Sequence, residues 1–518
     1  MKLSMWMLDI AREQCPTLDH LRRYCRLTLE SGYHAIGLYL EHRFAYPSAP
    51  WAHGIGCVTP DMVQKLQREF KDLQLVPFIN LLGHFEGMLY TEYGKRFAEE
   101  RMKGLQACAS NPDFVRLCES MIDDTLACFS SELIHIGGDE TAQLGKCPLC
   151  KEKLESSSAA DPKAELYGEH FKPLIERVAK AGRRPGMWAD MFLEHPDALA
   201  IVPKDTLLFD WHYNESCEPT TRKLMDAGFD VVCCPTLHIY NATWCHLPES
   251  ERNVRQALAD VRTCGAYGFC LTTWECGLFG AYDSVLPMVE AAGWLARGID
   301  PAGTVGILPA EAGTFLQAYA KRHPDYAEWA NLMGVQLQEL GPPFGFTGIR
   351  SSLKCRLMLY GNPFLAWFHH YKELSGETGQ KALALFGEAL KKAPTEEAKG
   401  VTVFARSAVE FVRIAEQARQ LYAAGLPAEA IAKLALTRQI FDDLAKVARK
   451  THERIGGSLA DIERCRVAKE HVEKVIRRIR DYGDGSLGYL PAFEILASHH
   501  FMPHDQASWW VINRWGNE

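Results

Sequence analysis

The sequence lacks several features that would mark common functional classes. No stretch of about 18 apolar residues predicts a membrane-spanning helix. The net charge of −8 argues against binding to nucleic acid. There is no Gly-x-Ser-x-Gly turn for a serine nucleophile, and no His-x-His or His-Glu-x-x-His cluster for a catalytic metal. We therefore expect no membrane partner, no nucleic-acid partner and no cofactor.

The 17 cysteines do not have the pattern of a disulfide framework. Their number is odd, they are scattered, and several lie in apolar runs, such as Cys233, Cys234 and Cys270. Met1–Trp6 leads directly into the first apolar run, without a separate hydrophobic segment followed by a small-residue cleavage site. These observations predict reduced thiols in a cytoplasmic protein.

One pair of cysteines has the spacing of a metal-binding motif, Cys147-Pro148-Leu149-Cys150. A closed zinc site needs four ligands, usually two such pairs or one pair together with histidines. The sequence contains no second Cys-x-x-Cys pair. We interpret the pair as part of a reduced loop, with a metal site as the alternative, and predict no metal.

Eight short apolar runs in the first 300 residues are interpreted as strands. They are hydrophobic throughout rather than alternating, which is typical of parallel strands covered on both faces. Helix-like segments separate them, and Thr59-Pro60, Asn111-Pro112 and Asp161-Pro162 each have a capping residue before a proline suited to the first helical turn. The eight runs are Leu3–Ile10, His34–Leu40, Leu75–Asn80, Leu133–Gly137, Pro185–Ala189, Thr206–Trp211, Asp230–Cys234 and Gly268–Thr273.

Eight strands that alternate with helices predict an α/β fold, a closed (β/α)8 TIM barrel. An open doubly wound sheet is the alternative, weakened because no glycine-rich dinucleotide fingerprint follows the first strand. Beyond about residue 300 helical periodicity dominates, for example over Glu396–Ala424, Pro427–Lys450 and Leu459–Arg480. We therefore predict a barrel over residues 1–305 and an α-helical C-terminal domain over residues 306–518.

Polar and aromatic side chains follow every predicted strand, at the end where the active sites of such barrels lie. Tryptophans offer flat apolar faces, while carboxylates and an arginine bind hydroxyl groups. This combination is typical of a pocket for a sugar ring. The side chains at the eight strand ends are, in chain order, Asp9 with Arg12, Glu41, Asn80 with His84, Asp139 with Glu140, Trp188 with Asp190, Asp210 with Trp211 and His212, His238 with Tyr240, and Trp274 with Glu275.

The fourth strand end has the most specific pattern, Gly137-Gly138-Asp139-Glu140. Two glycines allow the backbone to turn tightly and to approach a ligand. Two neighbouring carboxyl groups cannot share one pKa, so one can stay ionised while the other holds a proton near neutral pH. Cleavage of a glycosidic bond needs such a pair, an acid for the leaving oxygen and an anion for the cation-like centre.

The segment His135–Glu140 reads His-x-Gly-Gly-Asp-Glu and resembles the hallmark of glycoside hydrolase family 20, the β-N-acetylhexosaminidases. Asp9-Ile10-Ala11-Arg12 is similar to the first-strand Asp-x-x-Arg of the family, and Val76–His84 to a third-strand segment that ends in Gly-His. Asn111-Pro112 and Phe129–Glu132 are similar to the usual approach to the hallmark motif. The resemblance covers roughly residues 1–290.

The sequence departs from the family pattern in three places. The first strand begins at residue 3, without the small N-terminal α/β domain that is common in the family. Leu38–Glu41 and Tyr360–Pro363 are similar instead to a compact branch that has a helical C-terminal domain. Trp274-Glu275 lacks the one-residue spacer of the common Trp-x-Glu motif, which leaves open whether Glu275 binds distal sugar hydroxyls.

The resemblance implies an exo-acting enzyme that removes terminal β-linked GlcNAc or GalNAc with retention, assisted by the substrate. The 2-acetamido oxygen of the substrate would attack the anomeric carbon, Glu140 would be the general acid and then the base, and Asp139 would orient the acetamido group. Tyr240 would hydrogen-bond the acetamido oxygen, and Arg12 would bind ring hydroxyls. The other substrate-binding residues would be Glu41, His84, Trp188, Trp211, Trp274 and Glu275.

Two alternative functions stay open at this point. One is a glycosidase with a covalent carboxylate nucleophile, although adjacent residues are poorly placed to reach an anomeric carbon from two sides. The other is a carbohydrate-binding protein without catalysis, against which the intact carboxyl pair argues.

The roles of several aromatic and imidazole side chains also stay open. His84 is either a ligand-orienting residue or a core histidine, and His135 is expected to point into the barrel or its helix layer. The sequence does not decide between GlcNAc and GalNAc, and it allows a homodimer. The tryptophans of the last stretch are expected to pack against the barrel or a partner subunit; they are Trp509, Trp510 and Trp515.

Overall fold

The structure is a computed structural model, and it describes most of the 518-residue chain. In chain order, the described residues are 1–11, 16–53, 56–100, 105–238, 246–274, 285–298, 314–341, 344, 359, 374–455 and 460–483.

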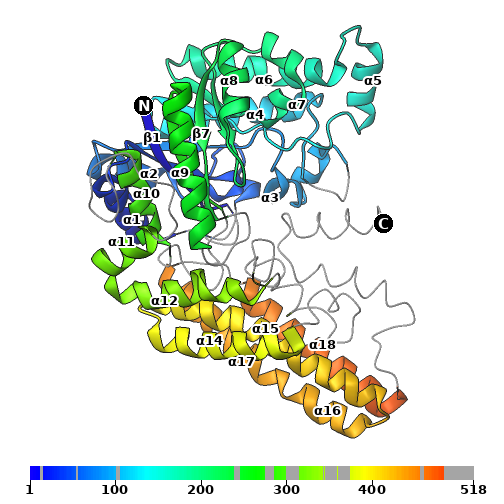
Figure 1. Ribbon diagram of the computed structural model, residues 1–518. Coiled ribbons are helices and arrows are strands. Elements are labelled where there is room, and N and C mark those ends of the chain that lie inside the picture. Colours follow the sequence, from blue (N-terminus) through cyan, green and yellow to red (C-terminus); the bar gives the residue numbers. More distant parts are fainter. Residues whose placement is uncertain are drawn as a thin grey trace.

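The strands form a closed parallel barrel (Figure 1). Within the described residues, eight strands follow one another in chain order around the barrel, and the first closes it by pairing with the last. The predicted (β/α)8 barrel is therefore confirmed, and the open sheet is excluded. The strands are β1 (Leu3–Asp9), β2 (Ala35–Tyr39), β3 (Gln74–Phe78), β4 (Leu133–His135), β5 (Arg184–Trp188), β6 (Leu207–Trp211), β7 (Asp230–Cys234) and β9 (Gly268–Thr273).

Each of the eight predicted runs overlaps one of these strands, with ends that differ by no more than two residues. The seventh strand is interrupted by Pro235, which has no N–H to donate to a neighbour. Beyond this proline the chain continues as the short strand β8 (Thr236–His238), which also pairs with β9.

Helices surround the barrel and begin at the predicted caps. The Thr59, Asn111 and Asp161 side chains each accept a backbone N–H in the first turn of a helix with proline at its start. The connection from β5 to β6 differs from the others, because it holds only the short helix α7 (Asp190–Glu194) and a 3-10 turn. The longer helices around the barrel are α1 (Leu18–Glu30), α2 (Pro60–Glu69), α4 (Pro112–Cys128), α6 (Pro162–Lys180), α8 (Glu218–Asp226), α9 (Leu247–Cys264) and α10 (Leu286–Ala296).

The barrel strands are buried on both faces, as the continuous apolar runs predict. In β1, Met5 and Met7 point into the barrel interior, whereas Trp6 and Leu8 pack in the layer between strands and helices. The interior is filled by side chains from all around the barrel, so it is a packed core rather than a channel. Its members include Val76, Phe78, Leu133, Trp188, Leu207, Phe209, Val232, Cys270 and Trp274.

Beyond the barrel, the regular elements of the described residues are helical. Figure 1 shows these helices gathered on one side of the barrel, below it in this view. The Glu251 carboxylate of α9 accepts the backbone N–H of Phe315 at 2.9 Å, and the Trp329 indole donates to Thr402 at 2.9 Å. The helices are α11 (Thr314–Arg322), α12 (Pro324–Gly334), α14 (Glu377–Lys392), α15 (Glu396–Ala423), α16 (Pro427–Ala435), α17 (Thr437–Ile455) and α18 (Ala460–Tyr482).

The helical pattern predicted over Pro427–Lys450 is confirmed, and it forms two helices. The chain forms α16 and α17 there, with Leu436 between them. The buried Thr437 hydroxyl donates to the Leu434 carbonyl at 2.7 Å and satisfies it where the first helix ends.

Several predictions fall on residues outside the described part of the chain. These are the boundary at residues 305 and 306, the segment Tyr360–Pro363 and the three tryptophans near the C-terminus. The division into two domains therefore stays a prediction. None of the helices that the structure describes is long and apolar enough to cross a bilayer.

Candidate active site

The Asp139–Glu140 pair follows β4 on a turn that only glycine fits. Gly137 and Gly138 have φ values of +76° and +101°. A Cβ atom on Gly138 would lie 2.6 Å from the Tyr167 hydroxyl and 2.7 Å from Met187 Cε. The same hydroxyl, which belongs to α6, donates to the Gly138 carbonyl at 2.7 Å, so this helix anchors the turn by a hydrogen bond. The two glycines thus allow the chain to reverse while it stays packed on the helix layer.

The connection after β3 meets this turn and brings His84 to both carboxyl groups. His84 Nε2 lies 3.0 Å from Glu140 Oε2 and 3.3 Å from Asp139 Oδ2. A Cβ atom on the neighbouring Gly83 would lie 2.3 Å from the Asp139 carbonyl oxygen, so the two backbones are in close contact. The sequence left His84 open between a ligand-orienting and a core residue, and the structure places it against the carboxyl pair.

His84 is held in its charged form by its surroundings. Burial lowers its pKa, but Tyr39 and the carboxylates of Asp139 and Glu140 outweigh burial and hold the pKa of His84 well above its ordinary value. On the other ring edge, His84 Nδ1 lies 3.7 Å from Glu86 Oε1. The imidazolium therefore lies among carboxyl groups and keeps those beside it hydrogen-bonded.

Glu41 joins the same group. It is buried at the end of β2, and its carboxylate, the His84 ring and the Glu86 carboxylate have ligand atoms within 4.8 Å of one another. These three side chains could hold a small cation. We interpret them instead as a support for His84, because the imidazolium already supplies the positive charge.

Asp190, a third carboxyl group at the site, lies at the end of β5. Its carboxylate accepts the backbone N–H of Glu140 at 2.8 Å and the Trp211 indole N–H at 3.4 Å. Desolvation, followed by the negative charge of Asp139, raises the pKa of Asp190 to about 8. Asp190 therefore carries a proton near neutral pH and links the Gly137–Glu140 turn to the Trp211 side chain.

Backbone strain is concentrated at this site. Among the described residues, the non-glycine residues with positive φ are Glu41 (+40°), His84 (+48°) and Glu140 (+46°). Each lies in the loop after a barrel strand, and each carries a side chain of the cluster. Such conformations cost about 1–3 kcal/mol and persist where packing enforces them. Because all three residues lie at the site, we infer that the packing of the fold enforces these backbone conformations and so sets the directions of the three side chains.

Tryptophans from three strands form the aromatic part of the site. Trp274 lies edge-on to Tyr39 with ring centroids 5.0 Å apart, and its indole donates to the Tyr213 hydroxyl at 2.8 Å. Trp211 stacks on Tyr213 at 5.2 Å and stays partly exposed. Trp188 lies deeper, 1% exposed, and contacts Trp274 at 5.8 Å. The three predicted tryptophans are thus brought together, with Trp188 beneath the other two.

His135 points into the barrel, which is one of the two positions expected for it. Its ring stacks on Phe78 at 4.3 Å and contacts Trp188 at 4.6 Å, and burial lowers its pKa well below the ordinary value. His135 Nδ1 accepts the Gly137 N–H at 3.1 Å. This histidine is a neutral core residue that shapes the turn.

Three predicted site residues, Arg12, Tyr240 and Glu275, lie outside the described residues. Asp210 points away from the site, because its carboxylate accepts the hydroxyls of Thr220 and Thr221 in the helix layer.

Four side chains at the site were not among the predicted site residues, although Asp190 was noted at the end of its strand. Asp190 and Glu86 follow strands, but a single carboxyl group after a strand has no distinguishing pattern. Tyr39 is the last residue of β2, and Tyr213 lies two residues beyond Trp211. The strand-end position was the only signal that could have found them.

Comparisons with known proteins agree with this geometry. The model of the glycosyl hydrolase family 20 catalytic domain matches residues 83–274, which include the His84, Asp139 and Glu140 cluster. Residues 83–274 belong to glycosyl hydrolase family 20. The family predicted from the hallmark motif is confirmed for this segment.

Two curated relatives match the same proportion of the chain. A β-hexosaminidase of Akkermansia muciniphila is 22% identical over 182 residues, which cover 33% of this chain and 35% of that protein. A β-hexosaminidase of Vibrio furnissii is 24% identical over 181 residues, which cover 33% of this chain and 28% of that protein. The match thus spans about a third of the length of these relatives.

A solved structure shares the fold of the family 20 domain. The β-N-acetylhexosaminidase of Bacteroides fragilis superposes with a TM-score of 0.50 at 16% identity, over 62% of this chain and 70% of that chain. At this identity the likeness shows the fold alone.

Proposed function

We propose that the protein is an exo-acting β-N-acetylhexosaminidase that hydrolyses terminal β-linked GlcNAc or GalNAc, assisted by the acetamido group of the substrate. The observation that carries the proposal is the unequal exposure of two neighbouring carboxyl groups that share one histidine. The side chain of Asp139 is 10% exposed and that of Glu140 is 58% exposed. The names of the two curated relatives support the same activity.

Glu140 is suited to proton transfer. Its carboxyl group reaches solvent, where a leaving oxygen and later a water molecule can approach it. His84 Nε2 binds one of its oxygens at 3.0 Å and orients the group. The general acid of the first step would thus become the general base of the second, as a retaining mechanism requires.

Asp139 is suited to hold the acetamido group. Its Oδ2 atom faces His84, while Oδ1 is buried and has no hydrogen-bond partner among the described residues. A buried carboxylate oxygen without a donor is costly, so a substrate N–H directed at it gains a strong interaction. This contact would turn the acetamido oxygen toward the anomeric carbon, and the negative charge of Asp139 would stabilise the oxazolinium-like intermediate.

The shared histidine also argues against a protein nucleophile in this pair. Asp139 and Glu140 both contact the same ring nitrogen, so they lie on one side of the site. A covalent mechanism needs its acid and its nucleophile on opposite sides of the scissile bond. This geometry supports the proposal that the substrate supplies the nucleophile.

The test measures p-nitrophenol release from the β-N-acetylglucosaminide, the β-N-acetylgalactosaminide and the plain β-glucoside. We expect turnover of an N-acetyl sugar, none of the glucoside, and a loss of about 10²- to 10⁴-fold in Glu140→Gln. Glu176→Gln makes the same chemical change at an exposed position on α6 and should leave the rate unchanged. Binding of an N-acetyl sugar by folded wild-type protein without turnover would favour the non-catalytic carbohydrate-binding alternative.

A reducing compartment remains our proposal for the location. The thirteen cysteines among the described residues carry free thiols, and most of them are buried. Fractionation of cells that express the tagged chain would test it, with recovery in the cytoplasmic fraction as the expected result.

A further inference from the structure

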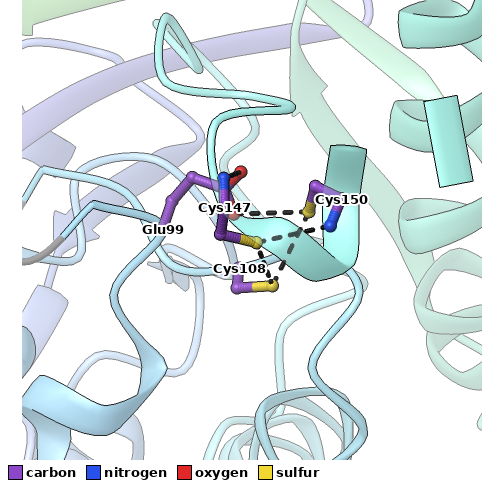
Figure 2. A group of neighbouring side chains, drawn as sticks. All are labelled: Glu99, Cys108, Cys147 and Cys150. Atoms are coloured by element: carbon purple, nitrogen blue, oxygen red, sulfur yellow. Dashed lines mark hydrogen bonds between the residues drawn. The ribbon is translucent and has the colours of Figure 1, made fainter. Parts of the chain in front are cut away.

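Three thiols and one carboxylate converge at a second place in the barrel, apart from the carboxyl pair. Glu99 and Cys108 come from the long connection between β3 and α4, whereas Cys147 and Cys150 begin the helix α5 (Pro148–Ser156) (Figure 2). Figure 2 shows their functional groups pointing toward one another. One ligand atom from each of the four lies within 4.8 Å of all the others.

The spacing of these atoms suits a metal ion better than a disulfide. Cys108 Sγ lies 3.3 Å from Cys147 Sγ and 3.6 Å from Cys150 Sγ, and Cys150 Sγ lies 3.3 Å from Glu99 Oε2. Sulfurs bound to a tetrahedral zinc at about 2.3 Å lie about 3.8 Å apart. A disulfide would bring two sulfurs to about 2.05 Å and leave the third thiol and the carboxylate unused.

The surroundings hold the four groups in place. Glu99 Oε1 accepts the backbone N–H groups of Lys146 at 2.7 Å and Cys147 at 2.9 Å, which leaves Oε2 directed at the thiols. Cys147 Sγ accepts the Cys150 N–H at 3.4 Å, and the Ser110 hydroxyl lies 3.2 Å from Cys150 Sγ. Such outer hydrogen bonds orient metal ligands, and the start of a helix favours thiolates.

Burial agrees with a closed site. Glu99, Cys108 and Cys150 are buried, and Cys147 is partly exposed. Four protein ligands leave no position for a substrate or a reacting water, which is the mark of a structural site. Three soft thiolates favour zinc over calcium or magnesium, which prefer oxygen ligands.

We propose that Glu99, Cys108, Cys147 and Cys150 together bind one zinc ion. The ion joins the β3 connection, which carries His84, to the β4 connection, which carries the carboxyl pair. The same two segments are already paired by reciprocal amide contacts, in which the Gln106 and Gln143 side chains each accept the other's backbone N–H at 3.0–3.2 Å. The zinc ion thus holds together the loop that carries His84 and the loop that carries the carboxyl pair.

The sequence reasoning predicted no metal here because it found only two of the four ligands. Cys108 lies 39 residues before Cys147, and Glu99 lies 51 residues before Cys150. No local motif connects positions so far apart, and the barrel brings them together.

The test measures the metal content of the purified full-length protein by mass spectrometry, before and after dialysis against zinc chloride in reducing buffer. We expect one zinc per chain in wild type, and less than a tenth of that in Cys108→Ser and Cys150→Ser. Cys128→Ser is the matched control, because Cys128 is a free thiol of α4 outside the cluster, and it should keep its zinc.

A second measurement on wild type covers the case in which the serine variants do not fold. An organomercurial that captures thiolates should release one zinc per chain to a chromogenic chelator, and the Tm should fall by several degrees. Wild-type protein that takes up no zinc overturns the proposal, and so does a disulfide between two of the three cysteines in the native protein. Equal zinc in wild type and cluster variants also overturns it. Each result is independent of glycosidase activity.

Discussion

Replacing Gly138 by alanine should destabilise the Gly137–Glu140 turn more than the backbone conformation alone explains. Gly138 has a φ of +101°, and its added Cβ would lie 2.6 Å from the Tyr167 hydroxyl. The positive φ costs about 1–2 kcal/mol for a residue with a side chain. Displacing the buried Tyr167 hydroxyl from the Gly138 carbonyl costs a further ~1–3 kcal/mol. We therefore expect a loss of about 2–5 kcal/mol in the free energy of unfolding.

The matched control is Gly182→Ala. Gly182 lies two residues beyond the end of α6 with a φ of +74°, and a Cβ atom there would meet nothing within 4 Å. This variant should lose only the ~1–2 kcal/mol of backbone strain. Denaturant unfolding of both variants gives the difference, and the hydrolysis rate reports the position of Glu140. A displacement of about 1 Å can cost about 10²-fold in rate, so Gly138→Ala should lose activity and Gly182→Ala should not. Equal stability and equal activity in the two variants would refute the reasoning.

Two further predictions concern the titrating groups of the site. Between the ordinary value of 3.8 and about 8, folded protein holds a proton on Asp190 that the unfolded chain has lost, so stability falls as pH rises through this window. In Asp190→Asn the Tm should therefore fall less than in wild type between about pH 5 and 8; an identical fall in both proteins would contradict the assignment. His84 has a raised pKa, so its stabilising charge is present at low pH and is lost as pH rises through the folded value. His84→Gln should lower kcat by about 10- to 10³-fold, as expected for two lost contacts to charged groups, with a smaller change in KM; a loss confined to KM would show that His84 only binds the ground state.

The barrel was predictable because its strands are apolar on both faces. Leu133–Gly137 and Gly268–Thr273 have no helical period and no alternation, and this combination occurs where a sheet is covered on both sides. The capped helix starts at Asn111 and Asp161 followed from a polar side chain before proline. The helical pattern over Pro427–Lys450 did not reveal the break at Leu436, since apolar periodicity continues through it and the Thr437 hydroxyl donates to the Leu434 carbonyl there.

The site was predictable only where several residues lie next to one another in the chain. Gly137–Glu140 forms such a motif, and it identified the carboxyl pair. Asp190 was missed as a participant, because its link to Glu140 is a contact between two strand ends. Cys108 was missed for the same reason. Both residues reach their partners only because the fold brings distant segments together, and a single sequence does not show which segments these are.

We propose that the acetamido group of the substrate, oriented by Asp139, is the nucleophile. The most direct test compares kcat/KM for p-nitrophenyl β-glycosides whose acetamido methyl carries no, one, two or three fluorine atoms. Fluorine withdraws electrons from the carbonyl oxygen and weakens it as a nucleophile, while the sugar ring and the leaving group stay the same. If the acetamido oxygen is the nucleophile, kcat/KM falls steeply with each fluorine in wild type. Equal kcat/KM across the series would contradict it and would assign the attack to a group of the protein.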